Sequence, residues 1–304
     1  MELKQYANIG LVHAMAYPEA NSSEYEYLST LEKTVEDEYF DIVEIIPPLN
    51  PGMDGTVSEL VRSSGMDWVY CATPAQYGQM LDLNSFDPDA RAHAIDVLKR
   101  EIDYSNRLGI KKVQVCSGMQ VAEIKKRAAA RSVLAESLRA LCAYAEPADV
   151  SLVLEIFDFE IEKKRFLGHS IDAELVAREV TAQHSNFGLL QDLSHIPIMY
   201  ETPYPAVLTV APHLVHTHIG NCIFRDRTHP RFGDTHPMFS VADSEVGVSE
   251  LTAFLESLFA VDYLGAGKKG AVSFEVKTWK GENPNEIIAN AKNTLQQAWE
   301  AMDV

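Results

Sequence analysis

The chain has 304 residues, of which 46% are hydrophobic and 23% are charged, as is usual for a soluble globular protein. Its net charge of −18, from 26 basic and 44 acidic residues, argues against nucleic-acid binding, which needs a basic surface to neutralise phosphates. No apolar run approaches the roughly 20 residues that cross a bilayer, and residues 1–6 lack the apolar core of a signal peptide. We therefore expect a cytoplasmic protein with no membrane or nucleic-acid partner.

Short apolar segments alternate with longer helical segments along the chain. The first four predicted strands cover residues 9–12, 40–46, 68–72 and 113–116. Helices are predicted where apolar residues recur three and four positions apart, over residues 94–102, 132–141, 251–259 and about 284–301. Gly109 is expected to cap the first of these helices at its C-terminus. The cysteines form no CxxC pair, which favours reduced thiols over a cysteine zinc site; they are Cys71, Cys116, Cys142 and Cys222.

Four further predicted strands, over residues 152–155, 187–192, 214–218 and 271–275, each end in a side chain that can bind a metal. These side chains are Glu155, Asp192, His218 and Glu275. Packing alone explains such a set poorly, because unpaired carboxylates are costly to bury. Three carboxylates and one imidazole suit one divalent ion, and we expect Mn²⁺, with Mg²⁺, Co²⁺ or Zn²⁺ as alternatives.

Eight repeated βα units favour an α/β fold in which a parallel sheet closes as a (β/α)₈ TIM barrel. The alternative is a doubly wound sheet, which would carry a glycine-rich turn after its first strand, and none follows Val12. We predict a single domain over residues 1–304. Active sites of such barrels lie at the C-terminal ends of the strands, where all four predicted ligands fall.

The predicted ligands also suggest a reaction. An ion held between two carboxylates could bind the carbonyl and neighbouring hydroxyl of a sugar, polarise the carbonyl and stabilise an enediolate. Glu155 and Glu275 come from different sides of the ion, so one could remove a proton and the other could return it. Asp192 and His218 would mainly hold the ion. His216 shares a face with His218 one layer deeper, which indicates a core or supporting role.

A long connection over residues 221–248 follows the predicted strand at residues 214–218. Long loops inside compact domains are usually functional or disordered, and we interpret this one as an active-site loop, with a solvated surface insertion as the alternative. His229 and His236 each precede a proline in it. Either could be a general acid or base delivered by a lid, although the restriction that a proline imposes on the preceding residue also explains a turn.

Five residues are candidate substrate contacts. His13 follows the first strand, and His195 lies three positions after a predicted ligand. Arg225 and His229 lie in the long loop, and Lys277 shares a strand face with Glu275. The alternatives are an ordinary helix-start residue for His195 and exposed side chains for the arginine and the lysine.

In these residues the chain resembles the xylose isomerase-like TIM barrel superfamily, in particular its sugar isomerase/epimerase branch. The segment from Asp192 to His195 resembles the Asp-x-x-His of ketose 3-epimerases, in which the histidine contacts the substrate. The segment from His218 to Arg225 is similar to their His-to-Arg segment. The resemblance implies that Glu155 and Glu275 are both metal ligands and proton carriers.

A narrower resemblance is to the catalytic subunits of bacterial C-glycoside deglycosidases. It is carried by residues 154–158, by Lys163 and Lys164, and by residues 218–221 and 232–237. This resemblance implies a C–C lyase that acts on 3-oxo-C-glucosides, usually with a small β-rich partner subunit. A base would remove the proton at C2, the enolate would expel the aglycone from C1, and His236 could protonate the leaving carbon.

Three other expectations remain open. A sugar- or metal-binding barrel without turnover is an alternative to an enzyme. Type 2 apurinic endonucleases share the fold, but they would need further ligands for a trinuclear zinc cluster and a basic groove, which the charge of −18 argues against. A homo- or hetero-oligomer is expected.

Overall fold

Eight parallel strands close a barrel in chain order in the computed structural model, which describes residues 2–302. The strands are β1 (Ala7–Val12), β2 (Ile42–Ile45), β3 (Asp67–Cys71), β4 (Lys112–Cys116), β5 (Ser151–Ile156), β6 (Phe187–Asp192), β7 (Leu214–Ile219) and β8 (Gly270–Phe274). Because β1 pairs with both β2 and β8, the sheet closes on itself. The predicted TIM barrel is confirmed, and the closure excludes the doubly wound alternative.

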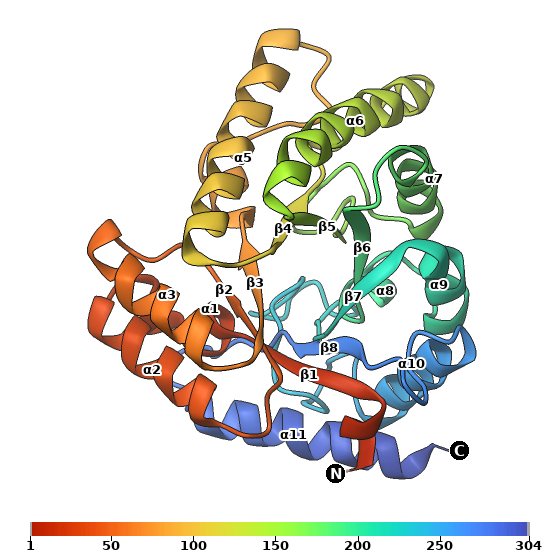
Figure 1. The fold of residues 1–304 in the computed structure, drawn as a ribbon. Helices are drawn as coiled ribbons and strands as arrows, with labels where there is room; N and C mark the ends of the chain where they lie inside the picture. Colours follow the sequence, from red (N-terminus) through yellow and green to blue (C-terminus); the bar gives the residue numbers. More distant parts are fainter. Residues whose placement is uncertain (1, 303–304) are drawn as a thin grey trace.

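Helices surround this central ring of strands (Figure 1). The outer helices are α2 (Glu24–Glu36), α3 (Asp54–Ser63), α5 (Pro88–Leu108), α6 (Ile124–Ala145), α7 (Ser170–Thr181), α9 (Pro203–Val210), α10 (Val248–Ala260) and α11 (Pro284–Ala301). Short helices follow three of the strands: α1 (His13–Ala16), α4 (Thr73–Gly78) and α8 (His195–Ile198). Single 3-10 turns cover Glu2–Gln5, Pro18–Asn21, Pro51–Met53, Glu146–Ala148 and Ala211–His213.

The ends of α5 show how local chemistry sets the helix boundaries. The side chain of Asp87 accepts the backbone N–H of Asp89, and Pro88 occupies the first helical position. At the other end Gly109 takes the left-handed conformation, with φ of 88°, and caps the helix as predicted. The helix begins at Pro88, before the predicted residue 94. The apolar pattern does not reveal its first turns, because their side chains are mostly exposed.

The main apolar core lies between the barrel strands and the surrounding helices, whereas Ile42, Val69 and Ala271 form a small separate cluster. β6 is buried along its whole length, as its continuous apolar run predicts. The ring of Tyr6, ahead of β1, lies 5.6 Å from the ring of Trp299 on α11, so the two ends of the described chain pack together. All four cysteines are free and buried. None of the described helices combines the length and the apolar composition that a bilayer crossing requires.

A bulge between β6 and β7 sets the register at the face where the predicted ligands lie. The pairing of the two strands skips Val215, so that Asp192 lies directly opposite His218. Gly188 makes room for the bulge, because a Cβ at that position would come within 2.4 Å of the Val215 side chain. A residue without a side chain is therefore needed on β6 for the two strands to approach in this register.

Candidate active site

The four predicted ligands converge at the C-terminal ends of neighbouring strands. Glu155 lies on β5, Asp192 ends β6, His218 lies on β7 and Glu275 directly follows β8. One ligand atom from each of the four lies within 4.8 Å of the others, and all four side chains are buried. The structure thus brings together residues spread over 121 positions of the sequence (275 minus 155 plus 1).

Hydrogen bonds orient each of these side chains. His218 Nδ1 lies 2.8 Å from Glu275 Oε2. The Ser194 backbone N–H donates to Asp192 Oδ1 at 2.8 Å, and the Ser194 hydroxyl donates to Oδ2 at 2.7 Å. Glu155 Oε2 accepts a hydrogen bond from the Gln114 side-chain amide. These contacts restrict how the four side chains can turn within the cluster.

The chemistry of this set fits a divalent cation. Three buried carboxylates share one small region, and Glu155 Oε1 has no hydrogen-bond partner among the described residues. A buried acceptor without a partner is costly, and a cation among the carboxylate oxygens would satisfy it. Oxygen ligands with one imidazole nitrogen are a suitable set for Mn²⁺, Mg²⁺, Co²⁺ or Zn²⁺.

A second group of polar side chains lies beside the first. His195 Nε2 lies 3.0 Å from Asp234 Oδ2, and His236 Nε2 lies 3.1 Å from Asp234 Oδ1. Lys163 Nζ lies 3.2 Å from the same carboxylate. His236 Nε2 is also 3.6 Å from Glu275 Oε1, which links the two groups. Asp234 is therefore the centre around which three cationic or ionisable side chains are arranged.

The charges of this second group stabilise one another. Burial disfavours an ionised Asp234, but His236, His195 and Lys163 outweigh that cost and hold the pKa of the Asp234 carboxyl well below its usual value. Burial also disfavours a charged His236, yet the carboxylates of Asp234 and Glu275 raise the pKa of His236 to about 9. The arrangement therefore favours protonated imidazoles around an ionised carboxylate.

The long loop has a defined path because Asn221 binds it at several points. The Asn221 side-chain amide donates to the carbonyl of Met238 at 2.8 Å and to the hydroxyl of Ser244 at 2.9 Å. Its oxygen accepts the backbone N–H of Val246 at 2.8 Å. The loop covers most of the predicted 221–248 range, since Val248 already begins α10. It brings Asp234 and His236 to the predicted ligands.

A cavity of about 350 Å³ opens beside the two glutamates. Glu155, Glu275, Gln114, Lys163 and Lys277 line its polar part. Its apolar part comes mostly from residues at or just after the ends of β1, β2, β3 and β5: Val12, Ala14, Met15, Ile46, Pro74, Tyr77 and Phe157. Asp192 and His218 are not among its lining residues. The cavity is thus lined by the two glutamates together with several apolar side chains.

The candidate substrate contacts, and the candidate acid or base His236, lie in different places relative to the cavity. Lys277 lines the cavity, and His195 and His236 lie among the buried polar side chains next to it. Arg225 instead points into solvent, with its side chain 77% exposed and its Nε 2.8 Å from Glu245. His229 accepts the backbone N–H of Arg231 at 3.0 Å, which fits the turn interpretation of the His-Pro sequence.

His13 also lies away from the cavity lining. Its side chain is fully buried, and its Nε2 lies 2.8 Å from the Thr30 hydroxyl on α2. Burial lowers the pKa of His13 to about 3, so that the ring is neutral. Its ring lies 5.4 Å from the ring of Tyr27 and 5.6 Å from that of Tyr17.

Sequence reasoning did not single out Glu44, Gln114, Lys163 or Asp234 as site residues. Glu44 and Gln114 lie within apolar strands, and a lone polar residue facing a barrel interior is the signal that marks them. Asp234 gives no such signal, because it belongs to a loop whose path is set by contacts with Asn221.

Comparison with known proteins agrees with the architecture. A family model described as xylose isomerase-like TIM barrel matches residues 34–298. No curated protein matches the chain.

Three similar solved structures cover nearly the whole chain. An L-ribulose 3-epimerase is 20% identical, with a TM-score of 0.71, and the match covers 97% of this chain and 96% of the other. A D-allulose 3-epimerase from a Methylomonas species is 18% identical, with a TM-score of 0.69 and coverage of 96% and 98%. A 3-keto-D-glucoside 4-epimerase from E. coli is 17% identical, with a TM-score of 0.65 and coverage of 95% and 99%. At these identities the likeness shows the fold, and with the family model it leads to one conclusion: the chain belongs to the xylose isomerase-like TIM barrel family.

Proposed function

We propose that this protein is a divalent-metal-dependent enzyme that moves a proton next to a carbonyl group of a keto sugar or a 3-oxo-glycoside. The observation that carries the proposal is the position of the cavity relative to the four ligands. Of the four, Glu155 and Glu275 line the cavity, whereas Asp192 and His218 do not. This difference supports two roles: all four hold the ion, and the two glutamates also reach the substrate.

The glutamates have the contacts that proton transfer needs. When bound, the ion would supply Lewis acidity that makes the C–H beside the carbonyl easier to deprotonate. The Glu155 carboxylate lines the cavity, so it can accept a proton from the substrate. Glu275 also lines the cavity, so it can return a proton, and His236 Nε2 lies 3.6 Å from Glu275 Oε1.

The names of the structural neighbours support the substrate class. They include an L-ribulose 3-epimerase, a D-allulose 3-epimerase and a 3-keto-D-glucoside 4-epimerase, all of which act on sugars. We therefore place the chain in the sugar isomerase/epimerase branch and take epimerisation or isomerisation as its first candidate reaction. We expect one bound divalent ion, Mn²⁺, and an oligomeric cytoplasmic protein.

One observation favours a second candidate, cleavage of a 3-oxo-C-glucoside. The apolar side chains that line the cavity include Met15, Tyr77 and Phe157, which would suit an apolar aglycone better than sugar hydroxyls. In this reaction His236 would supply the proton for the carbon that leaves by way of Glu275, because His236 itself is not among the residues that line the cavity. A small β-rich partner subunit, as in the C-glycoside deglycosidases, belongs to this candidate.

The test combines metal analysis with two substrate screens. Purified protein should contain one divalent ion per chain or take one up after chelation and reloading. The loaded protein is then incubated with free ketoses in D₂O and, separately, with 3-oxo-C-glucosides. Deuterium in a recovered ketose supports an isomerase or epimerase, and release of the aglycone supports the lyase. A folded protein that binds no divalent ion at any concentration tested contradicts the whole proposal.

A further inference from the structure

We propose that Glu44 is a positioning residue that fixes the ring of His218 so that its Nδ1 faces the metal site. The inference rests on the proposed metal-dependent function. Glu44 lies on β2, far from the four ligands in the sequence, and its side chain is fully buried. It does not line the cavity, so its role is exerted through the side chains that it contacts.

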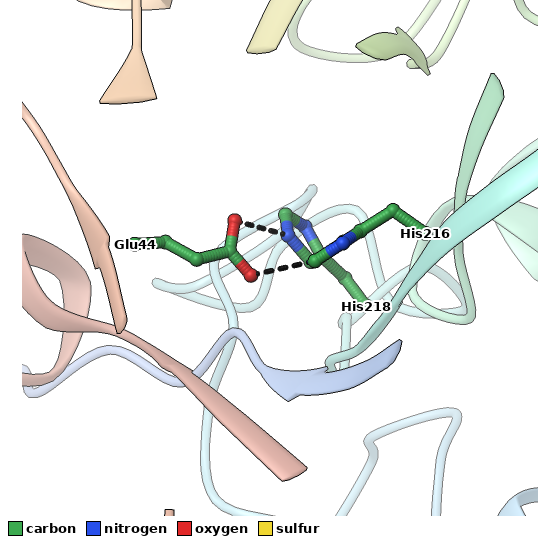
Figure 2. A group of neighbouring side chains, drawn as sticks. All are labelled: Glu44, His216 and His218. Carbon is green, nitrogen blue, oxygen red and sulfur yellow. Dashed lines mark hydrogen bonds and ion pairs between the residues drawn. The ribbon is translucent and has the colours of Figure 1, made fainter. Parts of the chain in front are cut away.

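Glu44 reaches across the barrel to two histidines of one strand. Its Oε2 lies 3.0 Å from His218 Nε2, and its Oε1 lies 2.8 Å from His216 Nε2. Figure 2 shows the carboxylate extending from β2 toward both imidazoles on β7. In the closed sheet β1 and β8 separate these two strands, so the contact spans the barrel interior. One carboxylate thereby holds two rings.

The consequence for His218 follows from the two nitrogens of its ring. Nε2 points to Glu44, whereas Nδ1 points to Glu275 Oε2 at 2.8 Å and to Glu155 Oε1 at 3.7 Å. Both nitrogens face a carboxylate, but an ion bound at Nδ1 would take the place of a hydrogen there, and the Glu44 carboxylate then keeps the one remaining hydrogen on Nε2 as a donor. The lone pair of Nδ1 is then directed at the other three ligands. This is the arrangement that a metal-binding histidine requires.

Further contacts hold His216, the second partner of Glu44. His216 Nε2 is also 3.2 Å from the Ser273 hydroxyl on β8. Gly10 on β1 gives that hydroxyl its space, because a Cβ at position 10 would lie 2.1 Å from Ser273 Oγ. Residues of β1, β2, β7 and β8 therefore build one polar layer beneath the metal site. A buried carboxylate needs such donors, so the histidines and Glu44 stabilise one another.

Titration calorimetry with Mn²⁺ on chelator-treated protein tests the role of Glu44. The variant Glu44→Gln keeps the size of the side chain but can accept a hydrogen bond through only one oxygen. Its NH₂ group would face Nε2 of His216 or of His218, which is itself a hydrogen-bond donor. We expect Mn²⁺ to bind about 10- to 100-fold more weakly to this variant, as is typical when a partner of a metal-binding histidine is lost. The matched control is Glu101→Gln, the same change at a carboxylate that accepts from Tyr70; its affinity should equal that of the wild type.

A second measurement on the wild type keeps the inference testable if Glu44→Gln does not fold. The ring nitrogens of ¹⁵N-histidine-labelled, Zn²⁺-loaded protein are examined by NMR, and His218 should carry its hydrogen on Nε2. A hydrogen on Nδ1, or an unchanged affinity in folded Glu44→Gln, would overturn the positioning role. So would a stoichiometry that falls from two ions to one in the variant, because Glu44 would then be a ligand itself. A wild type that binds no ion would instead refute the proposed function.

Discussion

His13 provides a quantitative test of the distinction between structural and functional histidines. Its Nε2 faces the Thr30 hydroxyl, which itself donates to the carbonyl of Glu26, so the ring nitrogen is the donor in that contact. Its Nδ1 is buried with no hydrogen-bond partner among the described residues. A proton added at Nδ1 would therefore be a buried charge without an acceptor, which is why burial lowers the pKa of His13 to about 3.

The sign of the pH effect follows from this lowered pKa. An unfolded histidine takes up a proton as the pH falls through about 6.5, whereas folded His13 does so only near pH 3. The unfolded state binds more protons between these values, so stability is lost as the pH falls. At about 1.4 kcal/mol per pH unit below 6.5, the loss between pH 7 and pH 5 is about 2 kcal/mol.

Thermal unfolding of the wild type and of His13→Gln measures this loss. Glutamine can still donate to Thr30 but takes up no proton. With 304 residues and an unfolding entropy of about 2.1 cal/mol/K per residue, about 2 kcal/mol corresponds to about 3 °C. The fall in Tm between pH 7 and pH 5 should be about 3 °C larger in the wild type than in the variant.

The control is His93→Gln, which removes an exposed histidine and should leave the fall in Tm unchanged. If Tm fell equally between pH 7 and pH 5 in the wild type and in His13→Gln, the argument that burial lowers the pKa of His13 would be refuted. Activity provides a further check, since a structural His13 predicts a kcat/KM within about twofold of the wild type in the folded variant. A tenfold loss of kcat/KM would instead restore His13 as a substrate contact.

Three further substitutions test the site. Glu275→Gln should reduce kcat by about 10²- to 10⁴-fold, the usual contribution of a positioned acid or base, with a Tm close to that of the wild type; full activity would rule out proton transfer by Glu275. Gly220→Ala would place a Cβ 2.7 Å from His236 Nδ1 and 3.2 Å from Asp192 Oδ1. We expect it to weaken Mn²⁺ binding in calorimetry and to lower kcat/KM by about 10- to 100-fold, and wild-type values for both would contradict this crowding. Arg225→Ala should leave KM within about twofold, because the side chain is in solvent; a tenfold rise in KM would show that it does contact the substrate.

The fold, and the convergence of the four predicted ligands, could be predicted from the sequence because both depend on local pattern. A buried strand is a short apolar run, and a predicted ligand is the acidic residue at or near its C-terminal end, as Glu155 and Asp192 are. The order of the units along the chain then determines their order around the barrel. No contact between distant residues has to be known for these predictions.

The supporting residues depend on contacts that only the closed barrel creates. Glu44 and His216 are 172 positions apart and meet because β2 and β7 face each other across the interior. Asp234 reaches the site because Asn221 fixes the path of the loop. Arg225 looked like a substrate contact, but the loop turns it toward Glu245 at the surface. Composition and periodicity carry no information about these three arrangements.

The apolar wall of the cavity has a consequence for how this barrel can be adapted. The predicted ligands and proton carriers lie on or directly after β5 to β8, whereas Met15, Pro74 and Tyr77 belong to segments that follow β1 and β3. Substitutions at these three positions alter the shape offered to a substrate without touching a ligand. Variant libraries restricted to these three positions should therefore change which substrate is preferred while the affinity for the divalent ion stays constant. Substrate selectivity can then change without a change in the reaction that is catalysed.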